Sequence, residues 1–158
     1  MRFSGIINAK IDAKGRVFLP SDFRKCLSDA DMPLVLKKDV YEPCLVIYPR
    51  LVWAEEVNTL RSRLNRWNPA QAMIFRQFMA ESERVELDGN GRFLIPKRQI
   101  QLCCFDNCVS FVGVDDRIEL WGAAHIASHF LSPEVYAQSM AKFMSGEAAE
   151  DNSAAPPM

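Results

Sequence analysis

Apolar and polar residues alternate at two places in the chain, 76 residues apart. Ala9, Lys10 and Ile11 form the first alternating segment, and the Val-Glu-Leu sequence of residues 85–87 forms the second. Alternation with period two predicts half-buried strands, because successive side chains of a strand point to opposite faces. A glycine, three apolar residues and a proline follow in both places, which predicts a tight turn and a second strand.

The two places belong to an internal repeat. Residues 12–20 and 88–96 share aspartate, glycine, arginine and proline at four of nine positions. Residues 45–48 also resemble residues 118–121 at an offset of 73, so the second copy has lost three residues. Because the flanking strands come in the same order, each copy is predicted to be one supersecondary unit.

Each copy centres on its turn. Gly15 and Gly91 supply the positive φ that a hairpin turn commonly requires. Asp12 and Asp88 can fold their carboxylates onto nearby backbone N–H groups and stabilise the turn. The proline that closes each block ends the second strand and can open a short helix. Those helices are expected over residues 21–27 and 97–103.

Between the copies the apolar spacing becomes helical. One stripe recurs at intervals of four, three, four and three, and it consists of Trp53, Val57, Leu60, Leu64 and Trp67. The Asn-Pro pair at 68–69 ends it, and a second helix is expected with Ile74, Phe75 and Phe78 on its inner side. The stripe fits packing within the chain or a subunit interface, and both remain open.

These patterns predict an α+β chain in five parts. Residues 122–146 look helical with a break at Pro133, and the last twelve residues are acidic, small and proline-rich, a composition that cannot bury a core. The expected division is 5–52 for the first unit, 53–80 for the helical insert, 81–124 for the second unit, 125–146 for C-terminal helices and 147–158 for a disordered tail.

Composition indicates an ordinary globular protein, with 158 residues of which 49% are apolar and 25% charged. No apolar run approaches the roughly 20 residues of a membrane helix, and the N-terminus lacks a secretory signal. The five cysteines are odd in number and fit no zinc spacing, so reduced and mostly buried thiols are expected. A cytoplasmic protein with no membrane contact is the simplest interpretation.

The charge is unevenly distributed along the chain. Residues 1–50 carry nine Lys and Arg against six Asp and Glu, and residues 51–100 carry eight against six. Residues 101–158 carry two against eight, although the formal net charge is only -1. A basic binding surface and an ordinary surface with an acidic tail both fit this distribution.

The turns carry the candidate chemistry. A glycine turn on a stiff two-stranded support would project Lys14 and Arg16 in the first copy and Arg92 in the second. A β-ribbon can enter the major groove, where arginine takes guanine O6 and N7 in a bidentate pair worth ~1–3 kcal/mol. Lys14 is better suited to phosphate. Alternatively, Asp12 could pair with Arg16, and Asp88 with Arg92, so that each arginine only braces its own turn.

No other pattern indicates catalysis, a metal, a cofactor or a small-molecule ligand. His125 and His129 are four apart on an expected helix but lack a third ligand, and the adjacent Asp115 and Asp116 fit a solvated turn. No nucleophile is paired with a base, so an enzyme is not expected.

The two Asp-x-x-x-Arg blocks, each followed by three apolar residues and proline, resemble the MraZ family, and the Phe23-Arg24 pair also fits. The resemblance covers residues 1 to about 145. It implies two AbrB-like units that interleave within one chain as a swapped-hairpin β-barrel. It also implies a regulator, usually a repressor, that binds G-rich direct repeats in double-stranded DNA. Those repeats lie upstream of the division and cell-wall operon that contains the regulator's own gene.

The resemblance further implies a nucleoid-associated homo-oligomeric ring. Arg16 and Arg92 sit where the family's motif arginines sit, and Lys14 matches in the first copy only. The residues predicted to contact DNA are Lys10, Lys14, Arg16, Arg24 and Arg92. Asn90 replaces the lysine of the first turn, and Glu83 and Glu86 precede the second, so the first turn is expected to contribute more binding energy. The rival interpretations are an antitoxin-like module, an oligomeric partner-binding scaffold and, more remotely, a hydrolase that uses the carboxylates.

Overall fold

The computed structural model describes residues 2–146, so the tail expected to be disordered lies outside the described residues. The described residues form two compact units that divide after Ala123, and each unit is described separately. None of the helices in the described part is long and apolar enough to cross a membrane.

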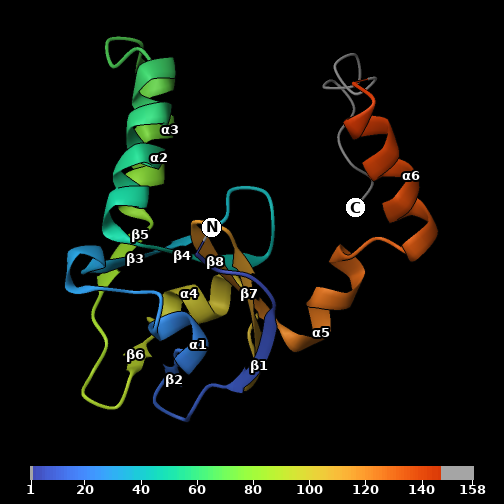
Figure 1. The fold of residues 1–158 in the computed structure, drawn as a ribbon. Coiled ribbons are helices and arrows are strands. Elements are labelled where there is room, and N and C mark those ends of the chain that lie inside the picture. Colours follow the sequence, from blue (N-terminus) through green and yellow to red (C-terminus); the bar gives the residue numbers. More distant parts are fainter. Residues whose placement is uncertain (1, 147–158) are drawn as a thin grey trace. The chain divides into compact units, whose positions relative to one another are not determined.

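The first unit combines short helices with antiparallel strands, which confirms the α+β class (Figure 1). Its strands are β1 (Ile6–Lys10), β2 (Arg16–Phe18), β3 (Leu34–Lys38), β4 (Cys44–Tyr48), β5 (Ser82–Val85), β6 (Arg92–Leu94), β7 (Cys108–Val114) and β8 (Arg117–Gly122). Its helices are α1 (Ser21–Arg24), the 3-10 turn Asp29–Asp31, α2 (Arg50–Arg63), α3 (Pro69–Ala80) and α4 (Lys97–Leu102). The helices after the two repeat prolines, α1 and α4, are shorter than expected.

A closed barrel is not what these strands form. Six of them make an open antiparallel sheet in the order β1-β7-β8-β4-β3-β5, and β2 pairs only with β6. β2 and β6 have three residues each between a turn and a proline-bounded helix. Proline cannot donate to a ladder, so neither strand extends far enough to join the larger sheet.

The strands on either side of each turn do not form a two-stranded support, contrary to the sequence-based expectation. β1 pairs with β7 of the second copy, and β5 pairs with β3 of the first. The backbone N–H of Ile11, next to the first turn, donates to Asn107 O at 2.9 Å instead of continuing a hairpin. Each turn is therefore held between strands of both copies.

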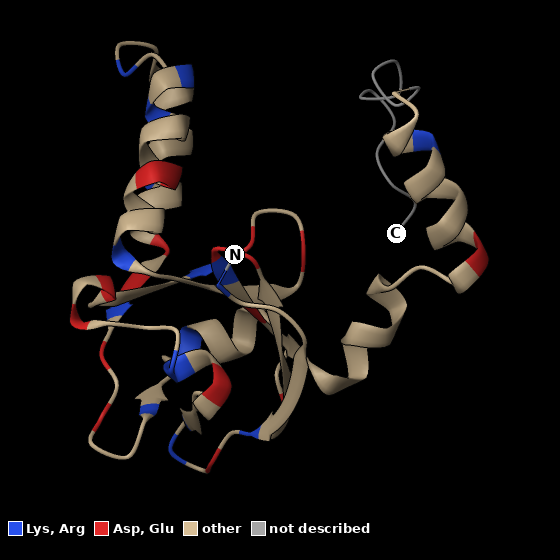
Figure 2. Ribbon diagram, in the orientation of Figure 1, with Lys and Arg blue, Asp and Glu red and all other residues tan. Residues whose placement is uncertain are grey.

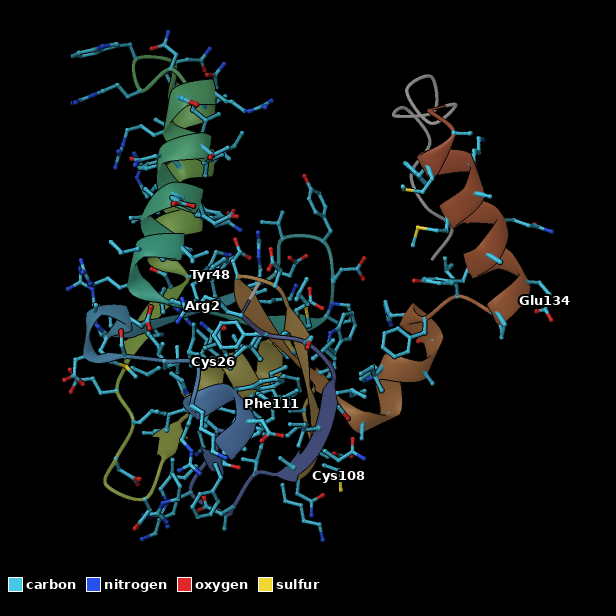
Figure 3. All side chains as sticks on the ribbon, viewed as in Figure 1. Arg2, Cys26, Tyr48, Cys108, Phe111 and Glu134 are labelled. Carbon is cyan, nitrogen blue, oxygen red and sulfur yellow. The ribbon has the colours of Figure 1, made fainter. Side chains whose placement is uncertain are left out.

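One core serves both copies. Val17 and Phe93 point inward from the two-stranded β2–β6 ribbon. Leu36, Leu45 and Phe111 are fully buried in the six-stranded sheet, and Figure 3 labels Phe111 among the side chains of the first unit. Apolar burial of this kind is the main stabilising term, at roughly 25 cal/mol per Å². Because residues of both copies form this one core, neither copy could bury its own apolar residues without the other.

The helical insert departs from its predicted stripe at one end. α2 ends at Arg63, and Leu64 has extended backbone angles, so Trp67 lies in the loop and is 80% exposed. Within the hairpin, Trp53 stacks on Phe78 with ring centroids 5.4 Å apart, and Val57 is buried. This part of the stripe packs within the chain.

Two of the five cysteines are buried, so the expectation of mostly buried thiols was only partly right. All five are free thiols, with Cys44 and Cys103 in the interior and Cys26 and Cys104 exposed. Burial raises the pKa of Cys103 to about 12 and also raises the pKa of Cys44, so both thiols stay protonated at neutral pH.

The second unit contains α6 (Pro133–Met144), preceded by the end of α5 (Ala123–Ile126) and a short 3-10 turn, Ala127–His129. The Ser132 side chain caps α6 by accepting a hydrogen bond from Val135 N at 3.4 Å. His129 Nδ1 lies 2.8 Å from His125 O, so a ring nitrogen of this pair is engaged locally.

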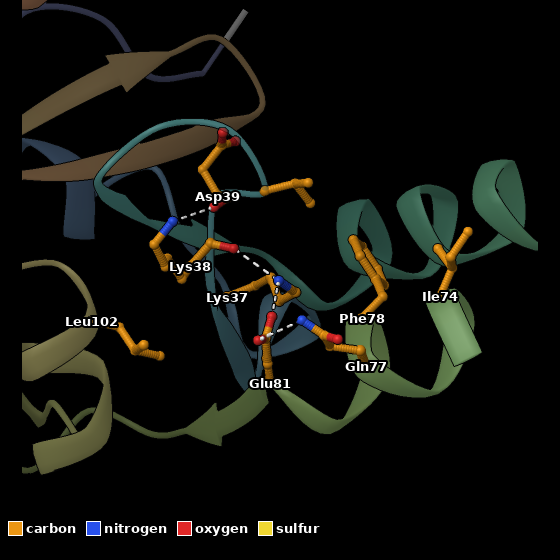
Figure 4. Close-up of a pocket in the computed structure, with 9 residues that line it drawn as sticks. Lys37, Lys38, Asp39, Ile74, Gln77, Phe78, Glu81 and Leu102 are labelled. Atoms are coloured by element: carbon orange, nitrogen blue, oxygen red, sulfur yellow. Dashed lines mark hydrogen bonds and ion pairs between the residues drawn. The ribbon is translucent and has the colours of Figure 1, made fainter. Parts of the chain in front are cut away.

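A buried ammonium ties β3 to the end of α3 (Figure 4). The Lys37 side chain is 3% exposed, and its Nζ donates to Lys38 O at 2.8 Å and Glu81 Oε1 at 3.1 Å. The same Nζ lies 4.9 Å from the centre of the Phe78 ring, beside a pocket of about 400 Å³. Removing the carboxylate would leave a buried charge with one backbone acceptor.

Glu81→Ala is therefore expected to lower the free energy of unfolding by about 2 kcal/mol, measured by urea denaturation. The double variant Lys37→Met with Glu81→Ala should recover part of that loss, because no charge is then left buried. Equal destabilisation in the single and double variants would show that the ion pair is not the cause.

Candidate nucleic-acid interface

The outer face of the β2–β6 ribbon carries both turn arginines. Arg16 lies opposite Leu94, and Phe18 lies opposite Arg92, so these four side chains share one face. Val17 and Phe93 occupy the other face and are buried. Phe18 and Leu94 are about half exposed, at 55% and 54%. The face therefore presents two guanidinium groups and two apolar side chains with approximate two-fold symmetry.

Turn 1 (residues 12–16) and turn 2 (residues 88–92) have nearly the same geometry. Asp12 Oδ1 accepts hydrogen bonds from Lys14 N and Arg16 N, each at 2.9 Å, and Asp88 Oδ1 does the same for Asn90 N and Arg92 N. The glycines have φ values of +88° and +81°, which only glycine adopts without strain. The aspartates thus stabilise the turns through the backbone.

These contacts also fix the ionisation of the two carboxylates. The hydrogen bond from Arg16 N is the main cause that holds the pKa of Asp12 below its ordinary value, and Arg92 N acts in the same way on Asp88. Because the pKa is lowered, both carboxylates stay charged to a lower pH than an ordinary aspartate, and they lose their turn-stabilising form only as the pH falls through the lowered pKa.

Each arginine is braced by its turn aspartate and is partly exposed at the same time. Arg16 Nε donates to Asp12 Oδ2, and Arg92 Nε donates to Asp88 Oδ2, both at 2.9 Å. Within residues 2–146, the Nη atoms of these two arginines have no hydrogen-bond partner, and the side chains are 35% and 24% exposed. Arg92 also lies over the Phe18 ring, 5.7 Å from its centre. Bracing fixes the guanidinium while its two Nη groups stay available for a ligand.

The copies contribute to each other's turns. The Arg24 Nη1 of α1 donates to Asn90 O in turn 2 at 3.2 Å, and a Cβ on Gly91 would meet the Arg24 side chain. The equivalent position in α4 is Ile100, whose Cδ1 lies 3.5 Å from a Cβ built on Gly15. Arg24 thus belongs to turn 2, although it follows turn 1 in the sequence.

The other predicted positions lie around the same end of the unit, where Figure 1 shows both turns and Figure 2 shows basic residues near them. Lys14 is exposed in turn 1, and Lys10 is exposed on β1 opposite Cys108. Lys97, which was not among the residues predicted from the sequence, lines a groove of about 520 Å³ with Lys14 and Gly15. No local pattern marks Lys97, because its helix reaches turn 1 only through the pairing between copies.

The expectation that turn 1 contributes more binding energy stays a prediction. Asn90 removes one cation from turn 2, but Arg24 supplies another there. The charge difference between the turns is therefore smaller than their local sequences indicate. Among the described residues, no group of three or more His, Cys, Asp or Glu side chains could hold a metal ion.

Fold and site together define a class: an α+β protein in which two copies of one unit interleave and present paired, braced arginines. The model of the MraZ protein family, described as antitoxin-like, matches residues 3–77. A "Transcriptional regulator MraZ" of Phocaeicola vulgatus is 50% identical over 145 residues, covering 91% of this chain and 94% of that protein. The chain belongs to the MraZ family of transcriptional regulators.

Other relatives agree. The protein of the same name from Bacteroides thetaiotaomicron is 45% identical over 152 residues, covering 96% of this chain and 97% of that protein. The one from Coxiella burnetii is 36% identical over 121 residues, covering 76% and 79%. The resemblance to MraZ is thus confirmed. A transcriptional regulator acts at nucleic acid, which makes the braced arginines the first candidates for its interface.

Proposed function

We propose that the chain binds double-stranded DNA in a sequence-specific manner through the outer face of the β2–β6 ribbon. Arg16 and Arg92 read guanine edges in the major groove, and Lys10, Lys14 and Arg24 contact phosphates. The observation that carries this proposal is the pair of braced guanidiniums whose Nη atoms remain available for a ligand. A guanidinium that is already held in place by its turn aspartate loses less conformational entropy on binding than a free side chain.

In this proposal the DNA sites are G-rich direct repeats upstream of the chain's own operon, and binding represses transcription. The two arginines on one ribbon suit guanines, because arginine is the usual partner of guanine O6 and N7. β1 of the first copy pairs with β7 of the second, and β5 of the second copy pairs with β3 of the first. This exchange of strands between the copies supports a swapped-hairpin arrangement formed within one chain.

The proposal includes self-association, as in a ring on nucleoid DNA. Several large apolar side chains of α6 are exposed, among them Tyr136, Met140, Phe143 and Met144. Clusters of this kind commonly mark contacts between proteins. Linking several ribbons would strengthen binding to repeated sites by raising the effective concentration of each further contact.

The test is titration of the wild-type chain against a labelled fragment of its upstream DNA and against a shuffled fragment of equal length. Specific binding should be retained for the upstream fragment at 0.15 M salt and should weaken steeply as the salt concentration rises. Equal affinity for the two fragments at every salt concentration would reject sequence-specific binding. An oligomer that binds neither fragment would favour the partner-binding scaffold.

A further inference from the structure

The end of the α2–α3 hairpin carries cationic charge that no described carboxylate neutralises. Residues 57–80 contain four arginines and no aspartate or glutamate. Figure 2 shows basic residues there, at the opposite end of the first unit from the two turns. In the described part of the chain, no carboxylate lies within 4.0 Å of these four arginines, whereas six other cations form ion pairs. They are Arg61, Arg63, Arg66 and Arg76.

Three of these arginines surround one groove of about 380 Å³, here called the arginine groove. Its lining consists of Arg61, Leu64, Arg66, Gln71, Ala72, Phe75 and Arg76. The walls are largely apolar and the charged groups are all of one sign. Like charges gathered without a counter-charge repel one another, so an anionic partner would relieve a cost that the free chain bears.

The loop that forms the groove is well ordered by its own hydrogen bonds. Asn68 Oδ1 accepts from Ala70 N at 3.0 Å, and Asn65 Oδ1 accepts from Trp67 N at 3.0 Å. Asn65 N donates to Gln71 Oε1 at 2.6 Å, which joins the loop to α3. A loop held in this way is preorganised, so less entropy is lost when a ligand binds.

Trp67 adds an aromatic surface beside the charge. Its side chain is largely exposed, and the Arg66 guanidinium lies 4.9 Å from the ring centre. The ring restrains Arg66 through a cation–π contact, and the indole N–H is a further donor.

We propose that the arginine groove binds phosphate groups of the duplex DNA backbone, without sequence preference and separately from the ribbon. Arginine forms bidentate hydrogen bonds with phosphate oxygens, and three guanidiniums around one groove match the spacing of a dense polyanion. The choice of DNA as the partner rests on the proposed function. Because the groove and the turns lie at opposite ends of the first unit, the chain would hold two separate stretches of duplex.

The test compares Arg66→Gln/Arg76→Gln with a matched control, Arg50→Gln/Arg84→Gln, which removes two exposed arginines outside the groove. The probe is a duplex of unrelated sequence, titrated by fluorescence anisotropy between 0.05 and 0.3 M salt. The groove variant should bind roughly tenfold to sixtyfold more weakly at about 0.1 M salt, and its log–log salt slope should be shallower by about 2. The control should match the wild type.

A second readout is the emission of Trp67, which should change on addition of the duplex and should lose that response in Trp67→Phe. Equal behaviour of the groove variant and its control would overturn the proposal. So would tighter groove-dependent binding to phosphatidylglycerol-containing vesicles than to duplex at the same salt concentration. Loss of target preference in the wild type would count against the ribbon alone, because the groove is tested by the difference between the groove variant and its control and not by sequence preference.

Discussion

Replacing Arg16 and Arg92 together by alanine is expected to abolish the preference for the upstream DNA over a shuffled sequence. Each bidentate contact to guanine is worth ~1–3 kcal/mol of discrimination, so the pair should change the ratio of affinities by roughly 30-fold to 20,000-fold. The measurement is anisotropy with both duplexes at one fixed salt concentration. The fold should persist, because the backbone N–H groups of residues 14, 16, 90 and 92 still bind the turn aspartates.

Two further variants separate the contributions to this effect. Arg16→Lys/Arg92→Lys keeps both charges but removes the planar fork, so it should retain affinity for the shuffled duplex and lose the preference. Arg50→Ala/Arg84→Ala removes two exposed arginines elsewhere and should leave the preference unchanged. A double alanine variant that still discriminates between the duplexes would show that the arginines only brace their turns.

Local chemistry made the turns and the short helices predictable from the sequence. The Asp-x-x-Gly-Arg pattern specifies both a side chain that caps backbone N–H groups and a residue with positive φ, so its geometry depends on five consecutive residues. The proline after each block explains why α1 and α4 begin where they do. These features need no information about distant parts of the chain.

The pairing between the copies could not be derived from such patterns. Alternation over residues 9–11 predicts a strand, and β1 does extend to Lys10, but the pattern does not specify β7 as the partner. For the same reason, the position of Arg24 over Gly91 was not evident, and neither was the role of α4 beside turn 1. The strand order depends on which arrangement buries the apolar faces of both copies at once. That is a property of the whole chain and not of any local pattern.

The insert illustrates a different limit. Periodicity alone extended the apolar stripe to Trp67, yet the chain leaves the helix at Leu64, and asparagine side chains then organise the loop. Asparagine competes with helix formation by bonding to its own backbone, and this competition outweighs a favourable apolar spacing. As a result Trp67 is exposed, and its ring lies beside Arg66 of the arginine groove.

Gly113→Ala is expected to be the most damaging single substitution for stability. A Cβ at this position in β7 would lie 2.6 Å from Phe3 C and 2.8 Å from Ser4 Cα, both backbone atoms that cannot move aside cheaply. Residues 3–5 are fixed there by Gly113 N donating to Gly5 O and Asp115 N donating to Phe3 O, each at 2.8 Å. Phe3 is itself buried and packs edge-on against Phe23, so displacing this segment would open the core.

The expected loss is about 3 kcal/mol, which combines overpacking with partial loss of a buried aromatic side chain and should lower Tm by roughly 10 °C. Gly89→Ala is the matched control, because a Cβ there meets nothing within 4 Å and its φ is not positive. That variant should keep the wild-type Tm or raise it slightly by restricting the unfolded chain. Because Gly113 lies outside both turns, any DNA-binding loss in Gly113→Ala should disappear when binding is measured well below its Tm. Similar Tm values for the two variants would mean that the N-terminal segment does not depend on the close approach at Gly113.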